Sequence, residues 1–117
     1  MNEPDLSVRA KASACVSEIL DAEFFRALCE PARLELISVL VRLGRSDVTT
    51  IAREMTQDRS VVSRHLQVLE RAGIVQSRRE GRHVFHELDG PAVAAKLDRI
   101  ARDVRTLAPL CCPGPSG

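Results

Sequence analysis

Residues 47–75 constrain the fold of this chain more than any other segment. They read DVTTIAREMTQDRSVVSRHLQVLERAGIV. Apolar residues recur at helical spacing on both sides of the polar turn TQDRS, at Ile51, Met55, Val62, Leu66 and Leu69. Asp47 or Thr49 is placed to cap the first helix, and Gly73 stands where a helix commonly ends. Two short helices joined by a polar turn, the second beginning with Ser, Arg and His, have the layout of a helix-turn-helix.

A basic hairpin is predicted directly after this motif. Residues 75–88, VQSRREGRHVFHEL, contain two β-favouring runs around Glu80-Gly81. A basic hairpin that follows a helix-turn-helix is a wing, a loop that can lie on the DNA backbone. We therefore expect a mainly α fold with a small β-hairpin, a winged helix-turn-helix.

Helical patterns also flank the motif. Residues 5–28 are expected to form one helix, with an apolar stripe at Val8, Ala12, Cys15 and Ile19. A second helix begins near Pro31 and ends before Gly44. A last helix from Gly90 carries an apolar seam with alternating spacings of four and three residues, at Val93, Leu97, Ile100, Val104 and Leu107. A wing alone cannot bury this seam, so the first and last helices are expected to form the interface of a homodimer.

The chain is expected to divide at its C-terminal end. Residues 1–108 would form the DNA-binding and dimerisation domain. Residues 109–117, PLCCPGPSG, would form a Pro/Gly-rich tail that proline keeps from being helical.

Charge and composition narrow the function. Seven arginines lie between Arg53 and His83 against four acidic residues, a basic region on a chain whose net charge is +1. The chain has no apolar run near the roughly 18 residues of a membrane span, and its N-terminus has no apolar signal segment. We expect a cytoplasmic protein with reduced thiols. It has no Cys-x-x-Cys, and neither His83 nor His86 has an evident nucleophile partner, so an enzyme is not expected.

The chain resembles the ArsR/SmtB family of bacterial winged-helix repressors. The resemblance lies in FFRALCEPARLELISVL, SVVSRHLQVLERAGIV and REGRHVFHEL, in the family's order, and covers residues 20–107. It implies a homodimer joined through its first and last helices. It also implies repression of a small operon by binding double-stranded operator DNA, relieved by an inducer.

The winged-helix layout places the candidate DNA contacts. A recognition helix presents its N-terminal residues to base edges. Here these are Arg59, Ser60, Val62, Ser63, Arg64 and His65. The wing would contact phosphates or the minor groove through Arg78, Arg79, Arg82 and His83. For His65 a purely structural function is an equal alternative.

The two metal sites that the resemblance implies are both absent. One is a cysteine cluster in the helix before the recognition helix, but residues 47–55 contain no cysteine. The other uses Asp and His on the last helix, which here has Asp98 and Asp103 without a histidine. An all-oxygen pair is a poor zinc site.

The cysteines remain as candidate inducer ligands. Cys15, Cys111 and Cys112 could form a trigonal sulfur site for As(III), arsenite or methylarsenite, or for Hg(II), Cd(II) or Pb(II). Cys29 is a less favoured ligand and a better candidate for packing. Two alternatives remain open: a repressor switched by thiol oxidation or a persulfide, and a DNA-binding protein without any inducer.

Overall fold

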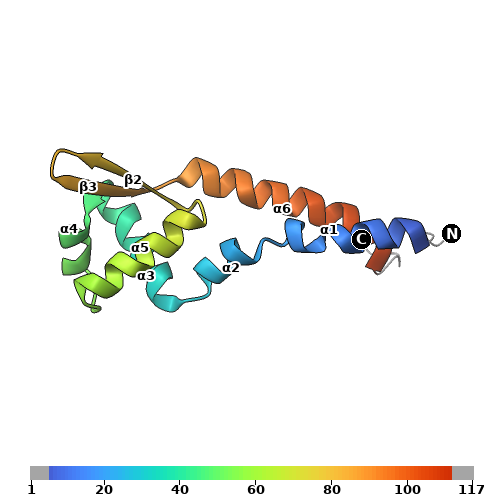
Figure 1. Cartoon of the computed structure of the whole chain (residues 1–117), viewed down its shortest axis with the longest axis horizontal. Helices are drawn as coiled ribbons and strands as arrows, with labels where there is room; N and C mark the ends of the chain where they lie inside the picture. The colour runs from blue at the N-terminus through green and yellow to red at the C-terminus, as the bar shows by residue number, and fades with distance from the viewer. Residues whose placement is uncertain (1–5, 112–117) are drawn as a thin grey trace. The chain divides into compact units, whose positions relative to one another are not determined.

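The helices and strands follow the order that the sequence predicts, except that one strand is added and the expected first helix is divided in two (Figure 1). The computed structural model describes residues 6–111. Its elements are α1 (Leu6–Ile19), α2 (Ala22–Leu28), α3 (Pro31–Leu43), β1 (Ser46–Asp47), α4 (Val48–Arg53), α5 (Arg59–Arg71), β2 (Val75–Glu80), β3 (His83–Leu88) and α6 (Gly90–Cys111). The predicted winged helix-turn-helix is confirmed, with α5 as its recognition helix and β2–β3 as its wing.

The described chain divides into two compact units. One unit spans residues 23–93 and contains the helix-turn-helix and the wing. The other combines α1 with the part of α6 from residue 94 onward. Within this second unit, Lys96 Nζ lies 2.6 Å from the Asp21 carboxylate, and both side chains are partly exposed.

The expected single helix over residues 5–28 is wrong. It breaks at Leu20 and Asp21, which form a turn between α1 and α2. Aspartate is a poor residue for a helix interior because its carboxylate competes for backbone groups. The Asp21 carboxylate accepts a hydrogen bond from Lys96 Nζ at 2.6 Å.

The helix-turn-helix is built as its local sequence predicts. Asp47 caps α4, with its side chain accepting a hydrogen bond from the Thr50 amide at 2.9 Å. α5 packs against α3 and α4, and its apolar residues Val62, Leu66 and Leu69 are buried. The chain leaves α5 through Gly73, whose φ of 78° is a conformation that favours glycine.

The wing belongs to a three-stranded antiparallel sheet of order β1-β3-β2. β1 was not predicted, because a strand of two residues has no periodicity to detect. In the hairpin Glu80 pairs with His83 around a tight turn, and Ser77 pairs with His86. Side chains alternate along strands, so Ser77 and His86 share the face of the buried residues Ser46 and Val75.

The last helix is longer than predicted. α6 continues through Pro109 to Cys111, so the first three residues of the expected tail are helical. A proline removes one backbone donor from a helix, and here the helix continues for two residues beyond it. Cys112 lies outside the described residues.

The apolar core belongs to the unit of residues 23–93. Its largest fully buried side chains come from α2, α3, α4, α5 and the link to β2: Phe24, Leu36, Leu40, Ile51, Val62, Leu66, Leu69 and Ile74. By contrast, neither α1 nor α6 contains a buried residue in one copy of the chain. Large apolar side chains on these two helices are exposed, among them Val8, Leu97 and Val104. This is the expected state of helices that form a dimer interface.

Among the described helices, none is both long and apolar enough to cross a membrane.

Replacing Leu36 by alanine should lower the free energy of unfolding by about 2–4 kcal/mol, because the change leaves a cavity in the core. Leu36 is 0% exposed, whereas Leu34 in the same helix is 51% exposed. Leu34→Ala is therefore the matched control and should cost less than about 1 kcal/mol. Urea unfolding followed by circular dichroism measures both. Equal losses in the two variants would contradict the core described here.

Candidate DNA-binding surface and thiol site

The N-terminal part of α5 presents a polar surface. Arg59, Ser60 and Arg64 are exposed, and Ser63 is half-buried. Asp58 occupies the N-cap position, but its side chain makes no capping hydrogen bond. The first-turn amides of α5 thus lack a carboxylate partner from this residue, and a helix N-terminus of this kind suits an anion such as a DNA phosphate.

Val62 does not belong to this surface. Its side chain is 0% exposed and lies in the core, so the predicted contact of Val62 with base edges is wrong. The physical reason is the helical period. Val62 shares one face of α5 with Leu66 and Leu69, and that face packs inward.

His65 is turned toward the protein interior. Its Nδ1 lies 3.4 Å from a guanidinium nitrogen of Arg33 in α3. Arg33 also donates to the carbonyl oxygens of Ala27, at 2.6 Å, and Arg26, at 2.9 Å. Burial, and next the positive charge of Arg33, lower the pKa of His65. An arginine only donates, so Nδ1 accepts, and the arrangement favours the structural alternative for His65.

The four predicted wing residues are exposed, but they do not share one face. Arg78 and His83 lie on the outer face of the hairpin, Arg79 lies on the opposite face, and Arg82 is in the turn. His83 Nδ1 is 3.8 Å from the Asp47 carboxylate. The three exposed guanidinium groups thus lie near the turn of the β2–β3 hairpin, where both faces of the wing can contact DNA phosphates.

Arg45 supports the outer face of the wing. Its guanidinium lies 4.4 Å from the centre of the Phe85 ring and forms an ion pair with Glu80. Its partners are more than thirty residues away in the chain, so no local pattern could identify this contact.

A second polar cluster joins the wing to α5. Ser77 Oγ lies 2.7 Å from His86 Nδ1 and 3.1 Å from a carboxylate oxygen of Glu70. The sequence gives His86 no evident nucleophile partner, whereas in the structure the Ser77 hydroxyl lies against its ring. The Ser77 hydroxyl also donates to the Glu70 carboxylate. Burial lowers the pKa of His86, while Glu70 and Asp47 act in the opposite direction.

Cys15, Cys29 and Cys111 are free and exposed. Cys111 is the last residue of α6 and lines a cavity of about 210 Å³ between α1 and α6. The other residues of this lining are Arg9, Ala12, Ser13, Val16, Leu107 and Leu110. Cys15 belongs to α1 but not to this lining, and Cys29 belongs to the other unit.

The described residues do not bring the predicted thiol ligands together. Across residues 6–111, no three His, Cys, Asp or Glu side chains are grouped so that they could hold a metal ion. Cys112, the remaining predicted ligand, lies outside this range. Cys15 and Cys111 are both in the unit formed by α1 and α6, which is the part of the chain that lacks a core of its own.

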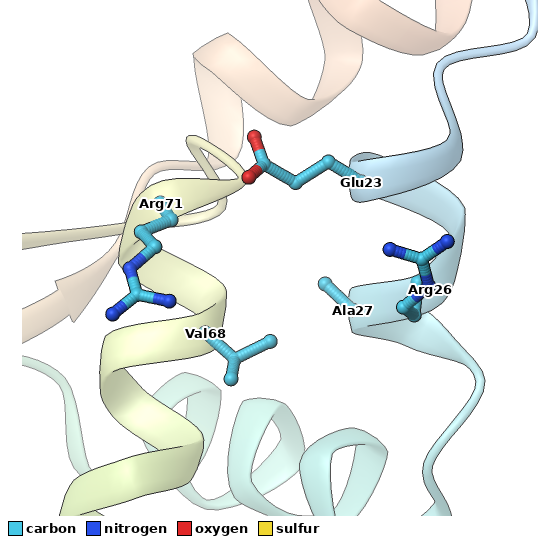
Figure 2. Close-up of a pocket in the computed structure, with 5 residues that line it drawn as sticks. All are labelled: Glu23, Arg26, Ala27, Val68 and Arg71. Carbon is cyan, nitrogen blue, oxygen red and sulfur yellow. The ribbon is translucent and has the colours of Figure 1, made fainter.

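A further pocket lies between α2 and the C-terminal half of α5 (Figure 2). It has a volume of about 180 Å³ and is lined by Glu23, Arg26, Ala27, Val68 and Arg71. Ala27 and Val68 form an apolar floor, and charged side chains stand around it (Figure 2). The pocket is at the other end of α5 from Arg59 and Arg64, so it is separate from the predicted base contacts.

Known proteins resemble this chain over most of its length. A protein-family model described as HVO_A0114 matches residues 28–89. The uncharacterized HTH-type transcriptional regulator Rv0081 of Mycobacterium tuberculosis (strain ATCC 25618 / H37Rv) is 36% identical over 85 residues, covering 73% of this chain and 74% of that protein. The arsenical resistance operon repressor of Escherichia coli (strain K12) is 30% identical over 112 residues, covering 86% of this chain and 96% of that protein.

Solved structures show the same fold. The ArsR-like transcriptional regulator from Rhodococcus sp. RHA1 superposes with a TM-score of 0.62 at 25% identity, covering 81% of this chain and 83% of that one. A homodimeric winged helix-turn-helix DNA-binding domain from Mycobacterium bovis, a possible ArsR-family regulator, gives a TM-score of 0.60 at 26% identity. That match covers 82% of this chain and 89% of the other.

The half-buried His65 predicts a loss of stability in acid. The pKa of His65 is lower in the folded protein than its ordinary value of 6.5, so the unfolded chain gains the proton first as the pH falls. The stabilisation is complete above that value and is lost as the pH falls toward the folded-state pKa. Replacing His65 with glutamine should flatten the decline, measured by urea unfolding between about pH 8 and pH 5. An unchanged slope would contradict the inward placement of His65.

Proposed function

We propose that trivalent arsenic is the inducer of this chain, which belongs to the ArsR/SmtB family of winged-helix transcriptional repressors. As a repressor it binds DNA, and the inducer releases it. One observation carries the choice of inducer. The free thiol of Cys111 lies at the end of α6, over a cavity against α1, the helix that carries Cys15, and its neighbour in the sequence is Cys112.

The DNA-binding surface of this proposal has two parts. Arg59, Ser60, Ser63 and Arg64 of α5 read base edges in the major groove, and the wing contacts phosphates through Arg78, Arg79, Arg82 and His83. All of these side chains except the half-buried Ser63 are exposed, which supports this assignment. Two copies of the chain would bind two half-sites, joined through α1 and α6. The absence of buried residues on either helix supports this dimer.

The inducer chemistry follows from the thiols. Each cysteine thiol replaces one hydroxyl group of arsenite and supplies its own proton to that hydroxyl, so one water leaves for each As–S bond that forms. Three thiolates, from Cys15, Cys111 and Cys112, would complete a trigonal site for this soft centre. Methylarsenite retains its methyl group and can take only two thiolates. The name of the Escherichia coli relative, an arsenical resistance operon repressor, supports arsenic over other soft ions.

A chain of contacts supports coupling between inducer and DNA. α6 begins directly after Asp89, which is hydrogen-bonded to residues at the start of β2. The Asp89 amide donates to the Ile74 carbonyl at 2.8 Å, and the Gln76 side chain donates to the Asp89 carboxylate at 2.7 Å. Asp89 also accepts a hydrogen bond from the Ala92 amide in the first turn of α6. A ligand that orders the far end of α6 would thus act on an element bonded to the wing.

The DNA-binding proposal predicts two different losses. Arg64→Ala should lower discrimination between operator and random DNA by about 10- to 100-fold, because a base contact is lost. Arg78→Ala should instead weaken binding to both sequences and reduce the salt slope of log K by about one. Fluorescence anisotropy over a range of salt concentrations measures both. Arg102→Ala, on the side of α6 away from the apolar seam, is the control. Unchanged discrimination in Arg64→Ala would contradict the assignment.

The inducer proposal predicts release of fully reduced protein from operator DNA by arsenite, in the presence of excess reductant. Cys111→Ser and Cys112→Ser should each abolish release by both arsenite and methylarsenite. Cys15→Ser should weaken the response to arsenite more than the response to methylarsenite, which needs one thiolate fewer. Cys29→Ser is the matched control and should respond as the parent does. Operator release is measured by anisotropy.

Other inducers give different results in the same assay. Release by Hg(II), Cd(II) or Pb(II) at lower concentrations than arsenite would contradict arsenic as the ligand. Release by peroxide or polysulfide, reversed by reductant and absent with arsenite, would contradict it in favour of a redox switch. A Cys111→Ser/Cys112→Ser protein that responds normally would contradict the thiol site itself.

A further inference from the structure

Side chains from three elements meet at the junction between the recognition helix and the wing. Ser77 is in β2, His86 lies directly opposite it in β3, and Glu70 is the next-to-last residue of α5. Ser77 Oγ is 2.7 Å from His86 Nδ1 and 3.1 Å from Glu70 Oε2. These contacts connect the end of α5 to both strands of the wing.

The donors and acceptors give this cluster a direction. An ionised carboxylate has acceptors only, so the single hydroxyl hydrogen of Ser77 points to Glu70. The Ser77 oxygen is then an acceptor, and His86 must supply the hydrogen from Nδ1. The chain of bonds therefore runs from the His86 ring to Ser77 and on to Glu70. A neutral His86 in this chain carries its hydrogen on Nδ1 and leaves Nε2 without one.

The short link between α5 and β2 does not by itself fix the position of the wing, and these side-chain hydrogen bonds add a second connection. Only residues 72–74 separate the two elements, and Gly73 among them has a positive φ of 78°. Backbone hydrogen bonds hold this link locally, for example from the Ile74 amide to the Leu69 carbonyl. These backbone bonds involve the link and not the middle of β2. The hydrogen bond between Ser77 and Glu70 connects the middle of β2 to α5. Ser77 and His86 are half-buried, which strengthens the hydrogen bond between them.

We propose that Ser77 and His86 are positioning residues for operator binding, which hold the wing at one angle to the recognition helix through Glu70. Neither side chain contacts DNA. They act by keeping the N-terminal part of α5 and the tip of the wing in one arrangement, so that both reach the duplex together. This inference rests on the proposed use of α5 and the wing as the DNA-binding surface.

The first test is the state of the His86 ring in the free, reduced protein. Nitrogen-15 NMR of the histidine side chains near neutral pH should show His86 protonated on Nδ1. In Ser77→Ala this preference should be lost, whereas Ser77→Thr, which retains a hydroxyl group, should preserve it. An Nε2-protonated ring in the parent, or a ring unaffected by Ser77→Ala, would overturn the proposal.

The second test is operator affinity in the absence of any inducer. Ser77→Ala should weaken binding about five- to tenfold, the effect of losing one net hydrogen bond, with an unchanged salt slope because no phosphate contact is lost. Ser77→Thr should recover most of the affinity. Ser38→Ala, an exposed serine in α3, is the matched control. A thermal melt of each variant separates a change in positioning from unfolding.

The outcomes separate the two proposals. If the parent binds operator and Ser77→Ala binds it equally well, the positioning function is overturned while the repressor function stands. If the parent itself binds no operator, the DNA-binding surface is wrong and this inference falls with it. The choice of inducer affects neither result, because no arsenical is present.

Discussion

The structure depends on the burial of one face of α5. This face carries Val62, Leu66 and Leu69, which are buried in the core against the helices that pack on α5. Because a helix has a fixed period, this packing also determines which residues remain outside. Arg59, Ser60 and Arg64 are exposed as a consequence, and no separate device is needed to display them. The surface offered to DNA is thus the complement of the core.

Polar contacts then fix α5 at its middle and at its C-terminal end. At the middle, His65 accepts from Arg33, which also donates to carbonyl groups at the end of α2. Near the C-terminus, Glu70 meets Ser77 of the wing. Apolar burial supplies most of the stability of such a domain but has little direction, whereas hydrogen bonds are directional. The core places the helix, and these side chains orient it.

Much of the fold could be predicted because its signals are local. The caps of α4, the end of α5 at Gly73 and the hairpin turn each depend on residues a few positions apart.

The errors in the sequence-based predictions have physical reasons too. The sequence pattern predicts Val62 both in the core and at the DNA, and a single side chain cannot be in both places. β1 is too short for a pattern, and Pro109 disturbs α6 less than a proline rule suggests. The partners of Arg45 and His86 lie far away in the sequence, so only the folded structure could identify them.

The lack of buried residues on α1 and α6 also affects how the protein behaves in a cell. In the proposed dimer these helices would bury apolar side chains that one copy leaves exposed, so the stability of this part would depend on association. If only the dimer binds DNA, the fraction of operator that is occupied changes more steeply than the protein concentration. Dilution at cell division or slow synthesis would therefore lower repression by a larger factor than it lowers the protein concentration. For the proposed dimer, the abundance of the chain would be a second control, beside any ligand.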